Sequence, residues 1–181
     1  MAYAEVHIRK GGCHIVAGMT DALEEAREFE TAMGMVSAHR RDKVQAYRFA
    51  KDRRLSLLSG LLLDELLDEC GMRERDMNYE EGEGGKPLFA NMPDLHFSLA
   101  HGERMAVAAL AHEPIGVDVE YLPTFPRDIA EPYSWTEMES VGKLLGCGVG
   151  KFVDGERYCR PDKTTVEHIL LDDYLICIAR Q

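Results

Sequence analysis

The stretch EPIGVDVE, Glu113–Glu120, is the one around which the rest of the chain is organised. Three β-branched residues alternate in it with Gly116, Asp118 and Glu120. Successive side chains of a strand point to opposite faces, so the pattern predicts a strand with one apolar face and both carboxylates on the other. Neighbouring carboxylates repel each other, and a hard divalent cation with oxygen ligands commonly relieves that repulsion. A solvated acidic strand face is the ordinary alternative.

A predicted helix provides a third carboxylate. The segment WTEMESVGKLLGCG, Trp135–Gly148, has apolar residues at helical spacing. Glu139 and Lys143 lie four residues apart and therefore share one helix face. An acid and a cation are thus available together downstream of the acidic strand.

Two more motifs precede the acidic pair: GGKP at Gly84–Pro87 and HFSLAHG at His96–Gly102. The ordered series GKP, FSLAHG, PIGVDVE and W-x-x-x-E-x-x-x-K resembles the 4'-phosphopantetheinyl transferase superfamily in its larger, two-lobed form. The motifs span residues 84–146, and a weaker match, RRDKVQAYRFAKDRRLSLLSGLLLDEL, extends back to Arg40. The resemblance implies an α+β fold of two pseudo-symmetric α/β lobes, each a small antiparallel sheet packed with helices. It implies a single domain over 1–181, with lobe 1 at about 1–102 and lobe 2 at about 103–181.

The resemblance also implies an activity. It is the transfer of the 4'-phosphopantetheine arm of coenzyme A to a serine of an acyl or peptidyl carrier protein of fatty acid, polyketide or nonribosomal peptide biosynthesis. Adenosine 3',5'-bisphosphate is released. A serine hydroxyl is a weak nucleophile and the pyrophosphate is anionic, so the reaction needs charge neutralisation, positioning and a base. The implied ligands of Mg²⁺, or of Mn²⁺ in its place, are Asp118, Glu120 and Glu139. The implied catalytic residues are Glu139 as base, directly or through metal-bound water, Lys143 facing the leaving group, and Asp118.

The implied contacts to coenzyme A come from the upstream motifs. Seven of the chain's 21 Lys and Arg residues fall within the sixteen residues 39–54. A solvated helical face is the routine interpretation of such a segment, whereas in the family it supplies cations to coenzyme A. The glycines before Lys86 allow a ligand to approach the backbone closely, and Pro87 fixes the exit of that loop. The implied coenzyme A-binding residues are Arg40, Lys43, Lys86, Pro87, Ser98 and His101.

Departures from the family pattern indicate a divergent and shortened member. Ser98 replaces an asparagine, Ala100 replaces a serine, and Met138 replaces a lysine. Only fourteen residues separate Glu120 from Trp135, an interval that is longer in the larger members and lies near their partner-protein surface. Three alternatives stay open: a descendant that binds coenzyme A or metal without modifying a protein, a metal-dependent hydrolase of nucleotide pyrophosphates, and a structural protein whose acids pair with the basic segment.

Composition limits the partners. The net charge of −11 disfavours nonspecific attraction to nucleic acid or to an anionic membrane. Five scattered cysteines without a Cys-x-x-Cys pair indicate reduced thiols in a cytoplasmic protein. The N-terminus lacks the basic start of a signal peptide, and the longest apolar run, at 55–67, is too short to span a bilayer. We therefore expect a cytoplasmic monomer with coenzyme A and a carrier protein as partners, and no nucleic acid or membrane.

The remaining periodicities predict the other elements. Residues 78–85 are expected to form a flexible acidic turn, and the apolar strand at 105–111 to form a hairpin with the Asp118 strand. The other expected strands and helices lie at 2–9, 14–17, 22–33, 55–70, 95–100, 166–171 and 174–179.

Overall fold

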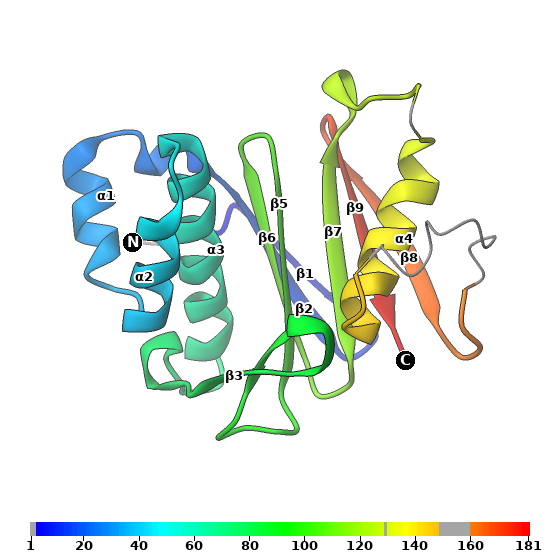
Figure 1. The fold of residues 1–181 in the computed structure, drawn as a ribbon, viewed down its shortest axis with the longest axis horizontal. Helices are drawn as coiled ribbons and strands as arrows, with labels where there is room; N and C mark the ends of the chain where they lie inside the picture. The colour runs from blue at the N-terminus through cyan, green and yellow to red at the C-terminus, as the bar shows by residue number, and fades with distance from the viewer. Residues whose placement is uncertain (1–2, 129, 149–159) are drawn as a thin grey trace.

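Two antiparallel sheets pack face to face, and helices cover the outer face of each (Figure 1). The computed structural model describes residues 3–128, 130–148 and 160–181. The expected mixed fold of small antiparallel sheets and helices is therefore confirmed. None of the helices in these described ranges has the length and apolar character needed to cross a bilayer.

The first sheet has four strands in the order β1-β2-β6-β5. They are β1 Val6–Lys10, β2 Cys13–Met19, β5 His96–Gly102 and β6 Met105–Ala111. The leucine-rich helix α3, Ala50–Asp68, packs on its outer face, and its leucines share a core with Val16, Ala108 and Phe97. Two shorter helices, α1 Ala26–Met33 and α2 Ala38–Ala46, lie beside α3 (Figure 1).

The second sheet has three strands in the order β7-β9-β8. They are β7 Ile115–Tyr121, β8 Thr165–Leu171 and β9 Tyr174–Arg180. The β-branched residues of the EPIGVDVE stretch point into a core shared with β2 and β6, so the predicted apolar face is the one between the two sheets. The other face of β7 is covered by helix α4, Pro132–Leu145.

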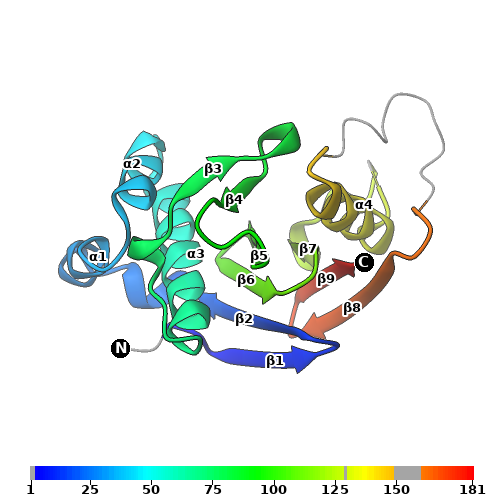
Figure 2. The same ribbon diagram turned by 90° about the horizontal axis from the view of Figure 1, so that it is seen from below.

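A small hairpin joins the two halves. Strands β3 Tyr79–Glu81 and β4 Pro87–Phe89 form it, and it extends from the α2 side toward α4 (Figure 2). Gly84 at its tip has a φ of 65°, and a Cβ there would overlap the carbonyl oxygen of Gly146 after α4. The expected turn at 78–85 is thus only partly right, since its first residues pair as a strand.

Two further expectations differ from the structure: the start of the first helix and the pairing of β6 with β7. The helix expected at 22–33 begins at Ala26, after a short 3-10 turn at Thr20–Leu23 whose first amide bonds the carbonyl of Arg104. The hairpin expected between β6 and β7 is wrong, because β6 pairs with β2 and β5 and β7 pairs with β9. The first sheet therefore includes β6 and extends to Ala111.

The other expected strands and helices are present, although β1 begins at Val6 rather than at residue 2 and α3 begins at Ala50 rather than at Leu55. Four of the five cysteines lie in described segments, and each is a free thiol: Cys13, Cys70, Cys147 and Cys177. Cys159 lies outside the described residues.

Candidate functional site

A cavity of about 280 Å³ lies at the seam between the two halves. Its walls come from α2, the β3–β4 hairpin, β5 and the C-terminal end of α4. Four cationic side chains line it, and no carboxylate is among its described lining residues. In a chain of net charge −11, this local excess of positive charge favours an anionic ligand. The four cations are Arg40, Lys43, Lys86 and Lys143.

Arg40 is the most deeply buried of these cations, with only 3% of its surface exposed. Its Nε lies 4.0 Å from Oε1 of the fully buried Glu74. The same Glu74 oxygen accepts a hydrogen bond from the Tyr79 hydroxyl at 2.6 Å and one from the Ser37 hydroxyl at 2.8 Å. Ser37 also caps α2, because its Oγ accepts from the Arg40 amide at 3.0 Å. Arg40 Nε itself is buried without a hydrogen-bond partner among the described residues, so Glu74 balances its charge without bonding it directly.

Lys43 lies one helical turn beyond Arg40 and borders the same cavity. Burial lowers the pKa of its ammonium group, and the charge of Arg40 lowers it further. An anion bound beside the two cations would favour their charged forms.

His101 lies near the cavity but is not among its lining residues. Desolvation by the surrounding protein lowers the pKa of its ring, and the charges of Lys143 and Lys43 lower it further. The ring is therefore neutral at pH 7 and offers one N–H donor. His101 is an exposed residue of β5, outside the cavity wall.

Lys86 ties the β3–β4 hairpin to the second half of the molecule. Its Nζ donates to the carbonyl oxygens of Ile115 at 3.0 Å and Leu144 at 3.2 Å. Burial lowers its pKa to about 8, so the ammonium is still charged at pH 7, and one of its three donors remains for a ligand. Pro87 follows as the first residue of β4 and also lines the cavity.

Ser98 links the two sheets. The Val117 amide of β7 donates to its Oγ at 3.0 Å, and the Ser98 side chain is buried. Ser98 also lines the cavity, so the residue that replaces the family's asparagine both aligns β5 with β7 and faces the candidate ligand.

Asp118 lies on the same face of β7 as Gly116, and this face is the one that α4 covers. Helix and strand approach so closely that a Cβ at position 116 would overlap the carbonyl oxygen of Ser140, and glycine at this position permits the approach. Asp118 is 6% exposed, and its Oδ1 accepts from Lys143 Nζ at 2.7 Å. Its Oδ2 is buried without a hydrogen-bond partner among the described residues. An unsatisfied buried acceptor costs about 1–3 kcal/mol or more, so a cation or donor from a ligand would be stabilising there.

Glu120 and Glu139 flank Asp118 on β7 and α4. Desolvation raises the pKa of both carboxyl groups, and the charge of Asp118 raises each further. Glu139 also raises the pKa of Glu120, whose Oε1 accepts from Trp135 Nε1 at 3.1 Å. The three acids therefore share one electrostatic environment.

The acids fit a hard divalent cation in charge and in ligand type. The buried Asp118 Oδ2 is the structural observation that favours one. Among the described residues, Asp118, Glu120 and Glu139 do not form a set in which one oxygen from each acid lies within 4.8 Å of the other two. Rotation of the Glu120 and Glu139 side chains would therefore have to complete the oxygen shell. Lys143 is the cation that neutralises Asp118 in this structure.

The structure thus arranges the residues expected from sequence in two adjacent groups. The anion cavity, as we call the 280 Å³ pocket, holds five of the expected coenzyme A residues: Arg40, Lys43, Lys86, Pro87 and Ser98. The acidic group consists of Asp118, Glu120 and Glu139. Lys143 belongs to both, since it lines the anion cavity and pairs with Asp118.

Sequence reasoning missed several residues of the site. Glu74 lies in the polar segment RERD, which is typical of a surface turn, and no local pattern signals its complete burial. The rings of His39 and Tyr79 stack with centroids 4.4 Å apart and line the anion cavity with Phe97. A stacked aromatic wall beside cations is suited to a ligand that carries both a flat ring and a phosphate.

Comparison with known proteins identifies the family. The family described as "4'-phosphopantetheinyl transferase, N-terminal" matches residues 24–113. The 4'-phosphopantetheinyl transferase ffp of Bacillus subtilis is 29% identical over 107 residues, which are 59% of this chain and 48% of the relative. The 4'-phosphopantetheinyl transferase Sfp of Bacillus subtilis (strain 168) is 27% identical over 107 residues with the same coverage. The chain belongs to the 4'-phosphopantetheinyl transferase superfamily.

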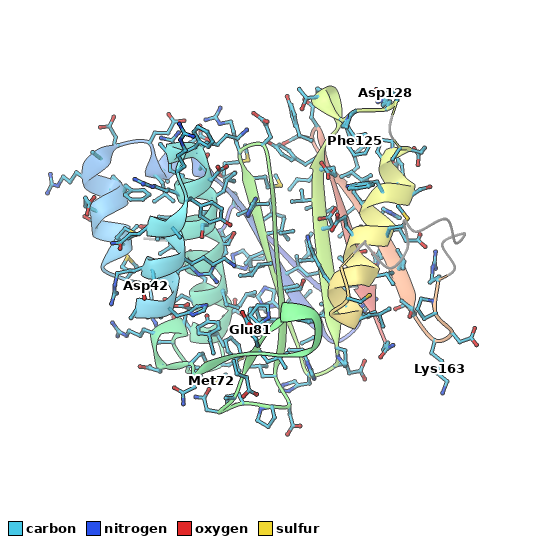
Figure 3. The ribbon with its side chains drawn as sticks, viewed as in Figure 1. Asp42, Met72, Glu81, Phe125, Asp128 and Lys163 are labelled. Carbon is cyan, nitrogen blue, oxygen red and sulfur yellow. The ribbon has the colours of Figure 1, made fainter. Side chains whose placement is uncertain are left out.

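As a member of this superfamily, the chain spans about half the length of the curated relatives it matches. The matched range 24–113 contains all six expected coenzyme A residues and ends before Asp118. Beyond β7, the short connection to α4 carries Phe125 and Asp128 and passes over the adjoining ends of both elements (Figure 3). The superfamily match thus covers the anion cavity more fully than the acidic group.

Proposed function

We propose that this protein transfers the 4'-phosphopantetheine arm of coenzyme A to a serine hydroxyl of an acyl or peptidyl carrier protein and releases adenosine 3',5'-bisphosphate. One observation carries the proposal: a cavity with four cations and no described carboxylate adjoins a group of three acids. The relatives named 4'-phosphopantetheinyl transferase support the reaction class.

In this proposal the anion cavity takes the phosphate-bearing end of coenzyme A. A volume of about 280 Å³ is near the lower limit of ligand pockets, so only part of coenzyme A would be enclosed. Arg40 and Lys43 would pair with phosphate oxygens, while Lys86 would add its remaining donor. His101 would contact the part of the ligand that leaves the cavity toward Lys143.

The acidic group would supply the chemistry. Asp118, Glu120 and Glu139 would hold Mg²⁺, or Mn²⁺ in its place, which neutralises charge on the pyrophosphate when bound. Lys143 would stabilise the charge that develops on the leaving group. The raised pKa of Glu139 suits it to accept the serine proton, and Glu120 is less suited because Trp135 holds it.

Two further expectations belong to the same proposal. The two halves would be related lobes, in which α3 on β2, β6 and β5 corresponds to α4 on β7, β9 and β8. The protein would act as a monomer in the cytoplasm.

The test is a reaction of the protein with coenzyme A, Mg²⁺ and a panel of apo carrier proteins from fatty acid, polyketide and peptide synthesis. Intact-mass measurement should reveal one added phosphopantetheine group on at least one carrier, and none after metal is chelated. Asp118→Asn should abolish the gain, whereas Lys51→Ala should not, because Lys51 pairs with Glu103 on the surface. Unmodified carriers throughout, together with intact bound coenzyme A, would contradict the transferase assignment.

A binding-only protein is the second candidate. It is favoured by the 2.7 Å ion pair between Lys143 and Asp118, which neutralises the acid without a metal. Under that alternative coenzyme A would bind with equal affinity in the presence and absence of Mg²⁺, whereas the transferase assignment requires tighter binding with the ion.

A further inference from the structure

A second cluster of ligand-type side chains lies away from the anion cavity, between the edge of the first sheet and the end of α3. His7 is on the edge strand β1 (Figure 2), His14 is on β2, and Glu69 directly follows the last residue of α3. His7 is paired with Val16 and His14 with Arg9, so both histidines lie on the face that α3 covers. One ligand atom from each of the three residues lies within 4.8 Å of the other two.

The spacing of the two imidazoles matches that of metal ligands. His7 Nδ1 and His14 Nε2 are 3.3 Å apart. Two nitrogens bound tetrahedrally at 2.0–2.1 Å from Zn²⁺ are separated by about 3.4 Å. Glu69 Oε1 lies 3.9 Å from His7 Nδ1, so the cluster offers imidazole nitrogens and a carboxylate oxygen within reach of one ion. Two histidines and one carboxylate with an open fourth position form a known type of zinc site.

The remaining hydrogen bonds orient the histidine for this role. His14 Nδ1 lies 2.9 Å from Glu69 Oε2. A histidine that donates one ring N–H to a carboxylate presents its other nitrogen as a lone pair for a metal. In the present structure that nitrogen, Nε2, is the one facing His7. To become a ligand of the same ion, Glu69 would have to turn from His14 Nδ1 toward that ion.

The surroundings favour a cation. The last turn of α3 contains no basic residue, and the C-terminal end of a helix carries partial negative charge. Arg9 opposes cation binding, because its Nη2 lies 2.6 Å from Glu69 Oε2, and Lys10 also lines the adjoining cavity. The Arg9 side chain is 69% exposed and contacts Glu69 Oε2, so it competes with an ion for the Glu69 carboxylate. A cavity of about 440 Å³ lined by His14 and Glu69 gives solvent access.

We propose that His7, His14 and Glu69 bind a divalent transition-metal ion of the Zn²⁺ type, with water as the fourth ligand. Bound metal would connect the β1–β2 hairpin to the end of α3 and stabilise the first sheet. Zn²⁺ prefers nitrogen together with oxygen ligands, and Mg²⁺ prefers oxygen alone, so the two ions would select different sites in this chain. This site shares no residue with the anion cavity or the acidic group, and it stands independently of the proposed function.

The test uses the full chain after treatment with a chelator, titrated with Zn²⁺ in excess Mg²⁺ by calorimetry. His7→Gln and His14→Gln are the test variants. His112→Gln is the matched control, because His112 lines the same cavity but its ring bonds the Asp94 carbonyl outside the cluster. We expect both test variants to lose at least tenfold in Zn²⁺ affinity and to lose the rise in melting temperature with Zn²⁺. The control should keep both.

Arg9→Gln gives a second, independent readout. Removal of the competing guanidinium should tighten Zn²⁺ binding severalfold. If the three residues formed only a hydrogen-bond network, neither Arg9→Gln nor the unsubstituted protein would bind Zn²⁺ at this site. The His7 side chain is 46% exposed, so His7→Gln will fold. Equal Zn²⁺ affinity in His7→Gln, His112→Gln and the unsubstituted chain would overturn the proposal. The proposal would also fail if His7→Gln lowered the melting temperature by the same amount with and without Zn²⁺.

Discussion

The two carboxylate oxygens of Asp118 are in different environments. Oδ1 accepts from Lys143, whereas Oδ2 is buried without a hydrogen-bond partner in the described parts of the chain. The charge of Asp118 also raises the pKa of Glu120 and Glu139. The acidic group is therefore under electrostatic repulsion that a divalent cation would relieve.

The raised pKa of Glu139 gives a pH-dependent prediction. Because the pKa in the folded protein exceeds its ordinary value of 4.5, the folded state binds more protons than the unfolded state between the two values. The contribution of Glu139 to the free energy of unfolding is thus fully present below pH 4.5 and is lost as pH rises through the folded pKa. Glu139→Gln should therefore melt higher than the unsubstituted protein at pH 7 without metal, and equally at pH 4.

Thermal unfolding over pH 4–8 in the presence of a chelator measures this effect. Glu113→Gln is the control, because Glu113 lies exposed in the turn between the sheets. If Glu139→Gln and Glu113→Gln follow the same pH profile, repulsion within the acidic group is not significant for stability.

Lys43→Ala tests the anion cavity. Each charge-assisted bond to a phosphate contributes about 1.5–3 kcal/mol, so the substitution should weaken coenzyme A binding about tenfold or more. Lys51→Ala removes the same charge outside the cavity and should change the affinity little. Calorimetry with coenzyme A and with dephospho-coenzyme A makes the measurement. Equal losses in the two variants would mean that only net charge matters.

At the scale of elements, the acidic group depends on how closely α4 packs on β7. Gly116 permits that approach, since a side chain there would overlap backbone atoms of Ser140 and Leu144. Backbone atoms cannot move aside as a flexible side chain can, so Gly116→Ala should lower the free energy of unfolding by about 2 kcal/mol or more.

Gly34→Ala is the matched control for Gly116→Ala. Gly34 follows the last residue of α1 with a φ of −72°. A Cβ added there would have one close neighbour, the carbonyl oxygen of Thr31 at 3.2 Å. Urea denaturation should give a small change for Gly34→Ala. If Gly116→Ala is equally mild, α4 is not held against β7 as described.

The sequence predicted elements well where periodicity alone decides them. The alternation at 115–121 gave the correct strand and the correct acidic face, and the apolar run at 105–111 gave β6. The hairpin at Tyr79–Phe89 was missed because its first strand is acidic and is followed by a glycine. A contact with Gly146, directly after α4 and far away in sequence, helps to hold it in place. Tertiary contacts likewise shortened the first helix, where Arg104 binds Asp21 and Glu24.

At the scale of the whole molecule, the site is a property of the seam between the two sheets. Ser98 and Lys86 each bridge the halves, through Val117 in one case and through Ile115 and Leu144 in the other. Motif order could place the residues near one another, but not the burial of Arg40 against Glu74 or the pairing of Lys143 with Asp118. Those contacts join distant segments, and no local pattern encodes them.

We propose that the anion cavity and the acidic group together transfer phosphopantetheine to a serine. Release of adenosine 3',5'-bisphosphate from coenzyme A tests it most directly, measured in parallel with an apo carrier, with the same carrier after its acceptor serine is changed to alanine, and without a carrier. The account predicts release only with the intact serine, in an amount equal to the carrier modified. Equal release in all three reactions would indicate hydrolysis, and no release in any reaction with carriers of all three pathways would contradict the claim.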